Sequence, residues 1–432
     1  MKKNPNKLFR NIAAVAMFLC APYAAAHSPE IHSDSLHFAK DTLKTKTEKT
    51  KVNLTDFDFG KYGKLKLSGY IQAQWQYAES KGASAFAQGG SFDAESNNRF
   101  AVRRGRIKLA YEIGFASLVI QPDFSEKGLK MRDVYIKLMT YDKVFGGQIG
   151  GFDRPFGYEI SYSSSVRESP ERSRIYSSLM PGEREVGALL KFSKWGLSLD
   201  AGVFNGNGLA TDNDSYKDFI GRLAYSIKFK DTELGAEASY YRGSILNKST
   251  NYFSFIEDEG FYSKSSNNEY NYKREYFGVG IHYNQKWWAG RTNIYSEYLW
   301  GTQPGSLYVN YNTVDGDDLS NPDNAIYVRK FRGGYVMLSH QIAQSKHSVV
   351  LKYDLYDPNT QVRGDEIGKL QNTTYADIAY TTYGIGYVFD WTSYLRLTAY
   401  YDIVCNETSE SYIDYKTKRD ENILTLRMQL KF

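Results

Sequence analysis

Apolar and polar residues alternate with a period of two along most of the chain from residue 64, and this pattern restricts the fold more than any other feature. In "KLKLSGYIQAQWQY" (64–77), Leu65, Leu67 and Ile71 share one face, opposite Lys66 and Gln72. Successive side chains of a β-strand point to opposite sides, so this stretch predicts a strand with one apolar and one polar face.

The same alternation recurs about sixteen times, which is an even number within the range of outer-membrane barrels. The stretches begin near Lys64, Arg99, Phe115, Met131, Val144, Glu185, Leu197, Asp218, Glu233, Glu275, Arg291, Lys330, His347, Thr381, Ser393 and Glu421. The 37 tyrosines and 24 phenylalanines, against 10 prolines, also favour β structure.

Long and short connections between these stretches alternate along the chain. The long ones run roughly over 79–98, 153–184, 206–217, 243–274, 302–329, 357–378 and 405–420, and only the link near 125–130 is brief. The short ones are turns such as "EIG", "YDK", "SKW" and "WAG". A soluble sandwich has no reason to keep its long loops at one end, whereas an outer-membrane barrel has long extracellular loops and short periplasmic turns. Both termini are then expected in the periplasm.

In a barrel that spans a membrane, one face of each strand meets lipid and the other meets the water-filled lumen. Every backbone polar group in hydrocarbon must be paired within the protein, so a closed barrel is the only β solution. The apolar face is then the outer one, and the charged face lines the lumen because it is too polar to be a packed core. We therefore predict an all-β fold, a transmembrane antiparallel barrel of about sixteen strands over residues 61–432.

The N-terminal part of the chain is not predicted to belong to the barrel. Residues 1–26 have the form of a signal peptide, with a basic start, an apolar run and "AAA" at 24–26. A lipoprotein anchored through Cys20 is the alternative, although the preceding Leu19 is bulky for such a site. Residues 27–60 are polar and charge-mixed, and we expect a periplasmic tail or linker.

The chain without its first 26 residues has 50 basic and 49 acidic residues, because that segment holds four of the 54 basic residues and no acid. This balance does not point to an anionic partner, and we expect no nucleic-acid partner. Only Cys405 remains of the two cysteines, which excludes an internal disulfide in the exported chain.

A ladder of basic residues is predicted on the lumen side of "RRGRIKLAYEI" (103–113). Arg104, Arg106 and Lys108 share one face, each step about 6.6 to 6.8 Å apart, opposite Ile107 and Leu109. Rings of Arg or Lys select anions in pores, and guanidinium groups add two-pronged hydrogen bonds to phosphate or carboxylate. The same alternation places Lys137 inside. In the alternative interpretation, such cations pair with acids on neighbouring strands and only make the lumen wall hydrophilic. The inward acids are Glu112, Asp123, Asp133, Asp200, Glu237, Glu297, Asp354 and Asp402.

The stretch "GGFDRPFGYEISYSSSVRESPERSR" (150–174), followed by "PGEREVGALLKF" (181–192) and "GVFNGN" (202–207), resembles the phosphate-selective porin O and P family of outer-membrane channels. The likeness covers most of the chain from about residue 60 to its end. The resemblance implies a sixteen-stranded barrel, a homotrimer, and a third extracellular loop, here 153–184, that folds inward and narrows the pore. Its motif residues are Pro155, Phe156, Gly157 and Glu159.

The resemblance also assigns pore residues and a role for the C-terminus. Arg154, Arg172 and Arg184 of the loop join the predicted anion-binding set, while the terminal Phe432 resembles the tag that the barrel-assembly machinery reads. The chain departs from the family at Asp153, where members often carry a basic residue. A carboxylate at the constriction repels the phosphate that such a pore would select.

We therefore predict a passive outer-membrane porin, with membrane lipid and small solutes as partners, a moderate preference for anions such as phosphate, and no cofactor or metal. A saccharide-preferring or general porin is the alternative, because the predicted inward tyrosines Tyr70, Tyr135, Tyr295 and Tyr400 could stack on sugar rings. A surface adhesin or receptor with a closed lumen is another.

A calcium site in "VDGDDLSNPD" (314–323) fails the usual spacing. His282, His340 and His347 lie in no catalytic motif, so no enzyme is predicted.

Overall fold

The computed structural model describes residues 55–84, 90–126, 128–246, 251–265, 271–310 and 325–432. The described residues all belong to one compact unit. The predicted signal peptide, most of the predicted tail and the segment 314–323, which was considered for calcium, lie outside the described residues.

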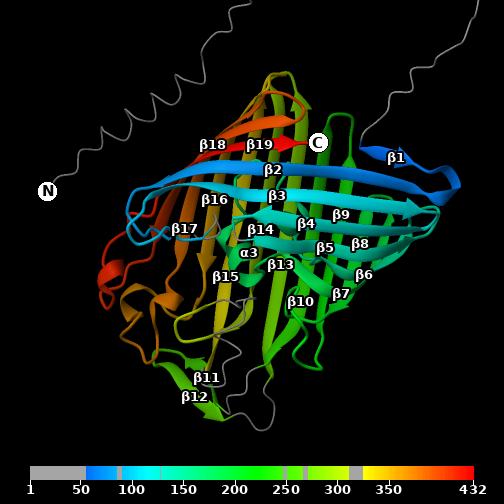
Figure 1. Ribbon diagram of the computed structural model, residues 1–432. Helices are drawn as coiled ribbons and strands as arrows, with labels where there is room; N and C mark the ends of the chain where they lie inside the picture. Colours follow the sequence, from blue (N-terminus) through cyan, green and yellow to red (C-terminus); the bar gives the residue numbers. More distant parts are fainter. Residues whose placement is uncertain (1–54, 85–89, 127, 247–250, 266–270, 311–324) are drawn as a thin grey trace, which may run out of the picture. The chain divides into compact units, whose positions relative to one another are not determined.

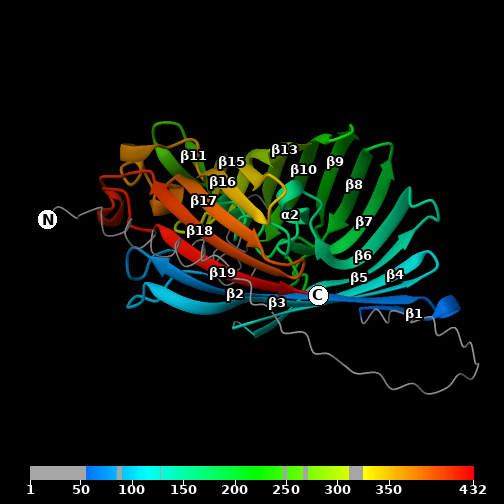
Figure 2. The same ribbon diagram turned by 90° about the horizontal axis from the view of Figure 1, so that it is seen from above.

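Sixteen strands close the described chain into one antiparallel barrel (Figures 1 and 2). They are β2 (Lys64–Ala78), β3 (Asn98–Ile113), β4 (Ala116–Ser125), β5 (Gly128–Met139), β6 (Phe145–Asp153), β7 (Arg184–Lys194), β8 (Leu197–Phe204), β9 (Asp218–Lys228), β10 (Thr232–Leu246), β13 (Asn271–Trp287), β14 (Gly290–Gly305), β15 (Ile326–Ile342), β16 (His347–Asp357), β17 (Tyr380–Asp390), β18 (Leu395–Asn406) and β19 (Ile423–Lys431). The last strand pairs with the first, Ile423 opposite Ala78 and Lys431 opposite Tyr70, which closes the ring. The predicted fold class is confirmed.

The alternation of faces follows the predicted one. On β3, Ile107 and Leu109 are exposed on the outside, whereas Arg104 and Arg106 are only 3% and 6% exposed. Because the outside of the barrel must meet hydrocarbon, these exposed apolar residues are the surface that a lipid-embedded barrel needs. Trp287 and Trp391, at the short turns, are half exposed, as expected of an interfacial aromatic girdle.

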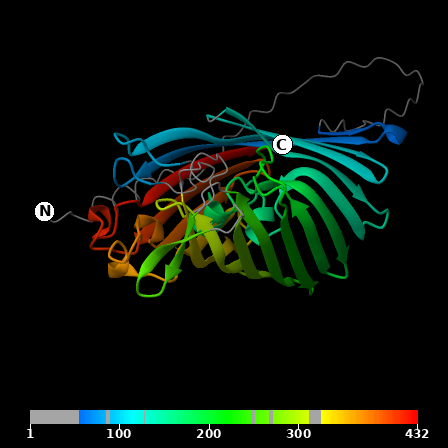
Figure 3. The same ribbon diagram turned by 90° about the horizontal axis from the view of Figure 1, so that it is seen from below.

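Three short strands lie outside the predicted set. β1 (Asp56–Asp58), followed by the 3₁₀ turn η1 (Gly60–Tyr62), pairs with the start of β2 inside the segment predicted as a tail. β11 (Asn251–Ile256) and β12 (Gly260–Ser265) form a hairpin in the long connection after β10. β11 then runs parallel to the start of β15, Tyr252 opposite Ile326, so this connection reaches across to a wall two strands away (Figure 3).

The helices are short and lie in the connections. They are α2 (Tyr158–Ser161), α3 (Arg174–Leu179) and the 3₁₀ turns η2 (Gly364–Glu366), η3 (Tyr375–Asp377) and η4 (Ile413–Tyr415). Among the described residues, no helix is long and apolar enough to span a bilayer. Figures 1 and 2 place α3 and α2 inside the ring of strands rather than on its rim.

The connection between β6 and β7, residues 154–183, is called the inner loop here, and it packs an apolar core inside the barrel. Its side chains Phe156, Ile160 and Ile175 are almost fully buried against wall residues such as Leu299 and Phe331. The prediction that inward residues are polar is therefore wrong for the walls that this loop covers. Apolar inward positions there are satisfied by the loop instead of by water.

A β-bulge interrupts the alternation on β3. Gln72 of β2 pairs with Arg104, while the next residue, Ala73, pairs with Val102, so Arg103 is the extra residue. A bulge leaves one residue unpaired and re-aims side chains locally. Strict alternation from Arg104 would send Arg103 outward, on the face of Ile107, yet its side chain reaches Glu171 inside the barrel, as described next.

Candidate functional site

The inner loop is fixed to one wall of the barrel by the carboxylate of Glu297, on β14. This carboxylate accepts the backbone N–H groups of Tyr158 and Glu159 at 2.7 and 2.9 Å. It also accepts the hydroxyls of Tyr176 in α3 and Tyr335 on β15 at 2.5 and 2.8 Å. One buried carboxylate therefore holds the loop at α2 and at α3 through three loop donors, and the Tyr335 hydroxyl of the wall is the fourth donor.

A second anchor joins the same stretch of the loop to β16. Glu159 forms an ion pair with Lys352 at 3.0 Å and accepts the backbone N–H of Ser173. The backbone N–H of Arg174 donates to Asp354 at 2.8 Å. The predicted motif residue Glu159 thus has a structural role, because it bridges both ends of the loop to the wall.

The loop then crosses to the opposite wall, where it meets β2 and β19. The Ser164 hydroxyl lies 2.6 Å from that of Tyr70, and its carbonyl accepts from Gln72 at 2.9 Å. Gln429 donates to the carbonyl of Ser165 at 2.9 Å. The inner loop is therefore fastened on both sides and divides the lumen, as the family resemblance implies for a constriction.

Three guanidinium groups meet one carboxylate at the far end of this crossing. Glu171 of the loop pairs with Arg103 at 2.9 Å, with Arg104 at 2.6 Å and with Arg427 of β19 at 2.8 Å. Burial opposes the charge of Glu171, but the three guanidinium groups outweigh it and hold the pKa of that carboxyl well below its usual value. We call these four residues the Glu171 cluster.

Arg167, also in the loop, adds a fourth cation beside the Glu171 cluster. Its guanidinium donates to the carbonyls of Ser169 and Pro170, and its Nη1 has no hydrogen-bond partner among the described residues. Burial and the charges of Arg172 and Arg104 lower the pKa of Arg167, although a guanidinium stays charged at neutral pH.

A second charged cluster lies at the return of the loop into β7. Glu183 pairs with Arg132, Arg172 and Arg184. Burial opposes ionisation of Glu183 as well, yet these guanidinium groups hold the pKa of its carboxyl well below the usual value. Arg184 also pairs with Asp133 at 2.9 Å and with Asp153 at 2.9 Å.

The charges at the crossing do not cancel. The guanidinium groups are those of Arg103, Arg104, Arg106, Arg132, Arg167, Arg172, Arg184 and Arg427, and the carboxylates they meet are Asp123, Asp133, Asp153, Glu171 and Glu183. Among these described residues the guanidinium groups outnumber the carboxylates with which they form ion pairs, while Glu168 of the same loop lies beside Arg167 and offsets part of that excess.

The predicted ladder is partly neutralised. Arg104 and Arg106 both face inward, but Arg104 belongs to the Glu171 cluster and Arg106 pairs with Asp123 of the adjacent strand at 2.8 Å. Cross-strand pairing, the alternative interpretation, therefore applies to Arg106. Lys108 lines a cavity nearer the short turns, and Lys137 lies on the inward face of β5. Among the described residues, no carboxylate lies within ion-pair distance of either lysine.

The remaining predicted site residues mostly have structural partners. Arg154 pairs with Glu185 at 2.8 Å, away from both clusters. Phe156 packs edge-on against Tyr176 and Tyr276 in the apolar core. Pro155 lines the same cavity as Lys108.

Gly157 precedes α2 at a φ of +68°, and a Cβ there would lie 1.8 Å from the Tyr176 hydroxyl. Only glycine combines that backbone angle with such a close approach.

The C-terminal strand ends as predicted on the outer face. Phe432 exchanges two backbone hydrogen bonds with Gly69 of β2, at 3.0 and 3.1 Å, and its ring covers that glycine. The ring is 56% exposed, like Met428 and Leu430 on the same face. Recognition by the assembly machinery stays a prediction.

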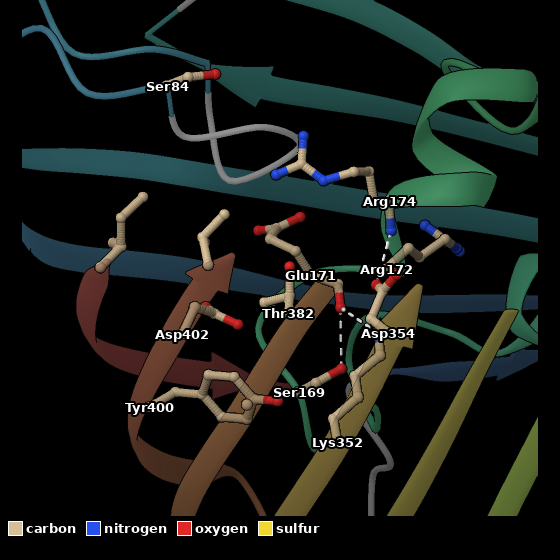
Figure 4. Close-up of a pocket in the computed structure, with 13 residues that line it drawn as sticks. Ser84, Ser169, Glu171, Arg172, Arg174, Lys352, Asp354, Thr382, Tyr400 and Asp402 are labelled. Carbon is tan, nitrogen blue, oxygen red and sulfur yellow. Dashed lines mark hydrogen bonds between the residues drawn. The ribbon is translucent and has the colours of Figure 1, made fainter. Parts of the chain in front are cut away.

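Two cavities flank the crossing, one on each side. The cavity toward the long loops, shown in Figure 4, is called the upper cavity here. It lies between the inner loop and the walls β16 to β18, with Arg172, Arg174, Lys352, Asp354, Thr382 and Tyr400 among its lining residues. The other cavity, toward the short turns, includes Lys108, Lys191 and Asp200.

Sequence reasoning missed Glu297, Arg103 and Arg427 as site residues. The alternation of faces puts Glu297 and Arg427 on the lumen side, but their partners lie on the inner loop, whose path a single sequence does not reveal. The inward position of the Arg103 side chain could be predicted only together with the β-bulge on β3. Among the described residues, no group of three or more His, Cys, Asp or Glu side chains is arranged to hold a metal.

Comparison with known proteins places this barrel among porins. The family model for phosphate-selective porin O and P matches residues 82–432. The structure is similar to OprB of Pseudomonas putida, with a TM-score of 0.55 and 10% identity, covering 85% of this chain and 94% of that one. It is also similar to the outer membrane channel DcaP of Acinetobacter baumannii, with a TM-score of 0.54 and 13% identity over 88% of this chain and all of that one (100%).

A third similar structure is the trimer form of OmpT from Vibrio cholerae, with a TM-score of 0.50 and 11% identity, covering 86% of this chain and 99% of that one. At these identities the structures establish the fold alone. No curated protein sequence matches the chain significantly. A closed sixteen-stranded barrel, divided by an inward-folded loop and matched by the family model over most of its length, is an outer-membrane porin channel, and the chain belongs to the phosphate-selective porin O and P family.

Proposed function

We propose that this porin passes small hydrophilic solutes passively and favours anions, phosphate among them, over cations of similar size. The observation that carries the proposal is the cluster of guanidinium groups where the inner loop crosses the lumen, in which several arginines share each carboxylate. Charged rings in a narrow, partly desolvated passage select ions of the opposite sign.

Two lysines on the periplasmic side strengthen this proposal. Lys108 and Lys137 face the lumen there, and among the described residues neither has a carboxylate within ion-pair distance. Cations at the mouth of a pore raise the local concentration of anions over a screening distance of about 8 Å at physiological salt.

The preference is expected to be moderate. Most of the guanidinium groups share carboxylates, so an incoming anion competes with Glu171 and Glu183 for them. The departure at Asp153 weakens phosphate selectivity less than its charge alone suggests, since Asp153 pairs with Arg184. A general preference for anions fits this arrangement better than a site specific for phosphate.

The proposal extends to export and assembly. Residues 1–26 act as a cleaved signal peptide, residues 27–60 as a periplasmic segment, and Phe432 as the signal for the barrel-assembly machinery. A homotrimer is supported by the trimer form of the similar OmpT structure. Native electrophoresis of the purified porin before and after heating would show one trimer band converting to a monomer band.

Removal of one guanidinium charge tests the selectivity. Arg103 is 26% exposed in its side chain, and Arg104 and Arg427 still neutralise Glu171 without it. We expect Arg103→Gln to lower the anion-to-cation permeability ratio roughly two- to threefold, since a unit charge at about 7 Å in water is worth about 0.6 kcal/mol. The measurement is the reversal potential in a planar bilayer under a KCl gradient.

The matched control is Arg291→Gln, which removes an exposed arginine at the short-turn end of β14. That charge is far from the crossing and screened by salt. Equal ratios for Arg103→Gln and the unchanged porin would refute the role given to the Glu171 cluster.

A further inference from the structure

The upper cavity holds polar atoms that the protein leaves without a partner. Asp354 is 7% exposed and Tyr400 is 2% exposed, and both line the cavity. Within the described part of the chain, neither Oδ1 of Asp354 nor the Tyr400 hydroxyl has a hydrogen-bond partner. A buried polar group without a partner destabilises the folded protein, so a ligand that completes these hydrogen bonds gains binding free energy.

Contacts within the fold hold the side chains of Asp354 and Tyr400 in place. Asp354 is fixed because its Oδ2 accepts the backbone N–H of Arg174, while its buried Oδ1 keeps its hydrogen-bonding capacity unused among the described residues. The Tyr400 ring packs over Gly384 and Gly386 of the adjacent strand, where any larger residue would collide with it. Figure 4 shows Asp354, Thr382, Tyr400 and Asp402 arranged around the same space.

Cations line the other side of this cavity. Arg172, Arg174 and Lys352 are among its lining residues, beside Glu171. Glu171 is already engaged by three guanidinium groups of its own cluster. Lys352 and Arg172 already pair with Glu159 and Glu183, so an anionic group of a solute competes with these carboxylates on the loop side of the cavity.

The unpartnered atoms select hydroxyl groups over an ammonium group. A hydroxyl both donates and accepts, so it can donate to Oδ1 of Asp354 and either donate to or accept from Tyr400. An ammonium group could donate to the same atoms, but it has no lone pair with which to accept the Tyr400 hydroxyl. The lining holds Glu171, Asp354 and Asp402 as well as Arg172, Arg174 and Lys352, so hydrogen bonding rather than net charge favours the hydroxyl.

We propose that the upper cavity is a binding subsite for small hydroxylated anions of the sugar-acid and sugar-phosphate class. The carboxylate or phosphate lies toward the inner loop, and the hydroxyls donate to Asp354 and Tyr400. This inference rests on the proposed anion preference and names the solute class that the extracellular side of the constriction favours.

The test compares three probes as blockers of the chloride current through the purified porin in a planar bilayer. Glucuronate carries both a carboxylate and hydroxyls, cyclohexanecarboxylate carries the same charge on a ring without hydroxyls, and glucose carries hydroxyls without charge. We expect half-block at a concentration about three to ten times lower for glucuronate than for either other probe, the worth of one hydrogen bond.

Tyr400→Phe is the decisive variant, because it removes a hydroxyl that bonds nothing in the described chain and so leaves the fold intact. We expect it to raise the half-blocking concentration of glucuronate about three- to tenfold and to leave that of cyclohexanecarboxylate unchanged. Thr382→Val, which removes another hydroxyl of the cavity lining, should act in the same direction. The control is Tyr383→Phe, on the adjacent strand, whose ring is 47% exposed on the outer face.

The outcomes separate this inference from the proposed function. Equal block by glucuronate and cyclohexanecarboxylate, or an unchanged response of Tyr400→Phe, overturns the subsite while an anion-selective reversal potential still stands. Equal block by glucose and glucuronate overturns the anionic part and indicates a neutral-saccharide site. A reversal potential without anion preference refutes the proposed function itself.

Discussion

At the scale of single residues, Glu297 determines where the constriction lies. Glu297 is 4% exposed, and its carboxylate accepts four hydrogen bonds. Three of these come from the inner loop rather than from an adjacent strand. The partners Tyr158 and Glu297 are 139 residues apart in the chain. Alternation placed Glu297 in the lumen, but no local pattern could identify a partner so distant. The same limit explains why the Glu171 cluster was not predicted.

We expect Glu297→Gln to loosen the inner loop without unfolding the barrel. The amide keeps one acceptor oxygen, while its NH₂ group faces donors, so about two of the four bonds are lost. Single-channel conductance should rise and the open-channel current should become noisier. The control is Asp200→Asn, which removes an inward carboxylate that pairs with Lys191 on the neighbouring strand. Unchanged conductance and unchanged current noise would contradict this role of Glu297, because the other anchors would then hold the inner loop without it.

At the scale of elements, the strands were predictable and the inner loop was not. Each strand shows its own two faces within about ten residues, because the outside meets lipid and the inside does not. The bulge at Arg103 and the hairpin of β11 and β12 break that rule, and they are the places where the prediction of elements failed. The loop path depends on contacts with walls that lie far away in sequence, such as Tyr70 with Ser164.

Two glycines of the inner loop separate backbone strain from crowding. Gly157 and Gly182 have φ values of +68° and +76°, but a Cβ at Gly157 would collide with Tyr176 and Glu297, whereas nothing lies within 4 Å at Gly182. Gly182→Ala should cost only about 1 kcal/mol of backbone strain. Gly157→Ala should in addition dislodge the Glu297 anchor and reproduce the larger, noisier conductance expected of Glu297→Gln. Identical recordings from the two alanine variants would contradict this account of the anchor.

At the scale of the whole molecule, the porin is a lipid-facing barrel whose lumen is narrowed by a loop with its own apolar core. The loop packs Phe156, Ile160 and Ile175 against one set of walls and presents its charged residues toward β2, β3 and β19. Permeation is therefore expected beside the arginine-rich side of the loop. The sequence indicated the barrel, its closure and the identity of the narrowing loop, but the net charge at the crossing required the ion pairs themselves.

The most direct test of this account is the reversal potential of the unmodified porin in a planar bilayer under a tenfold KCl gradient. The guanidinium groups gathered at the crossing predict a reversal potential of the sign expected for chloride permeation, with a permeability ratio that favours chloride several-fold over potassium. A potential near zero, or one of the opposite sign, would contradict the claim that the constriction selects anions.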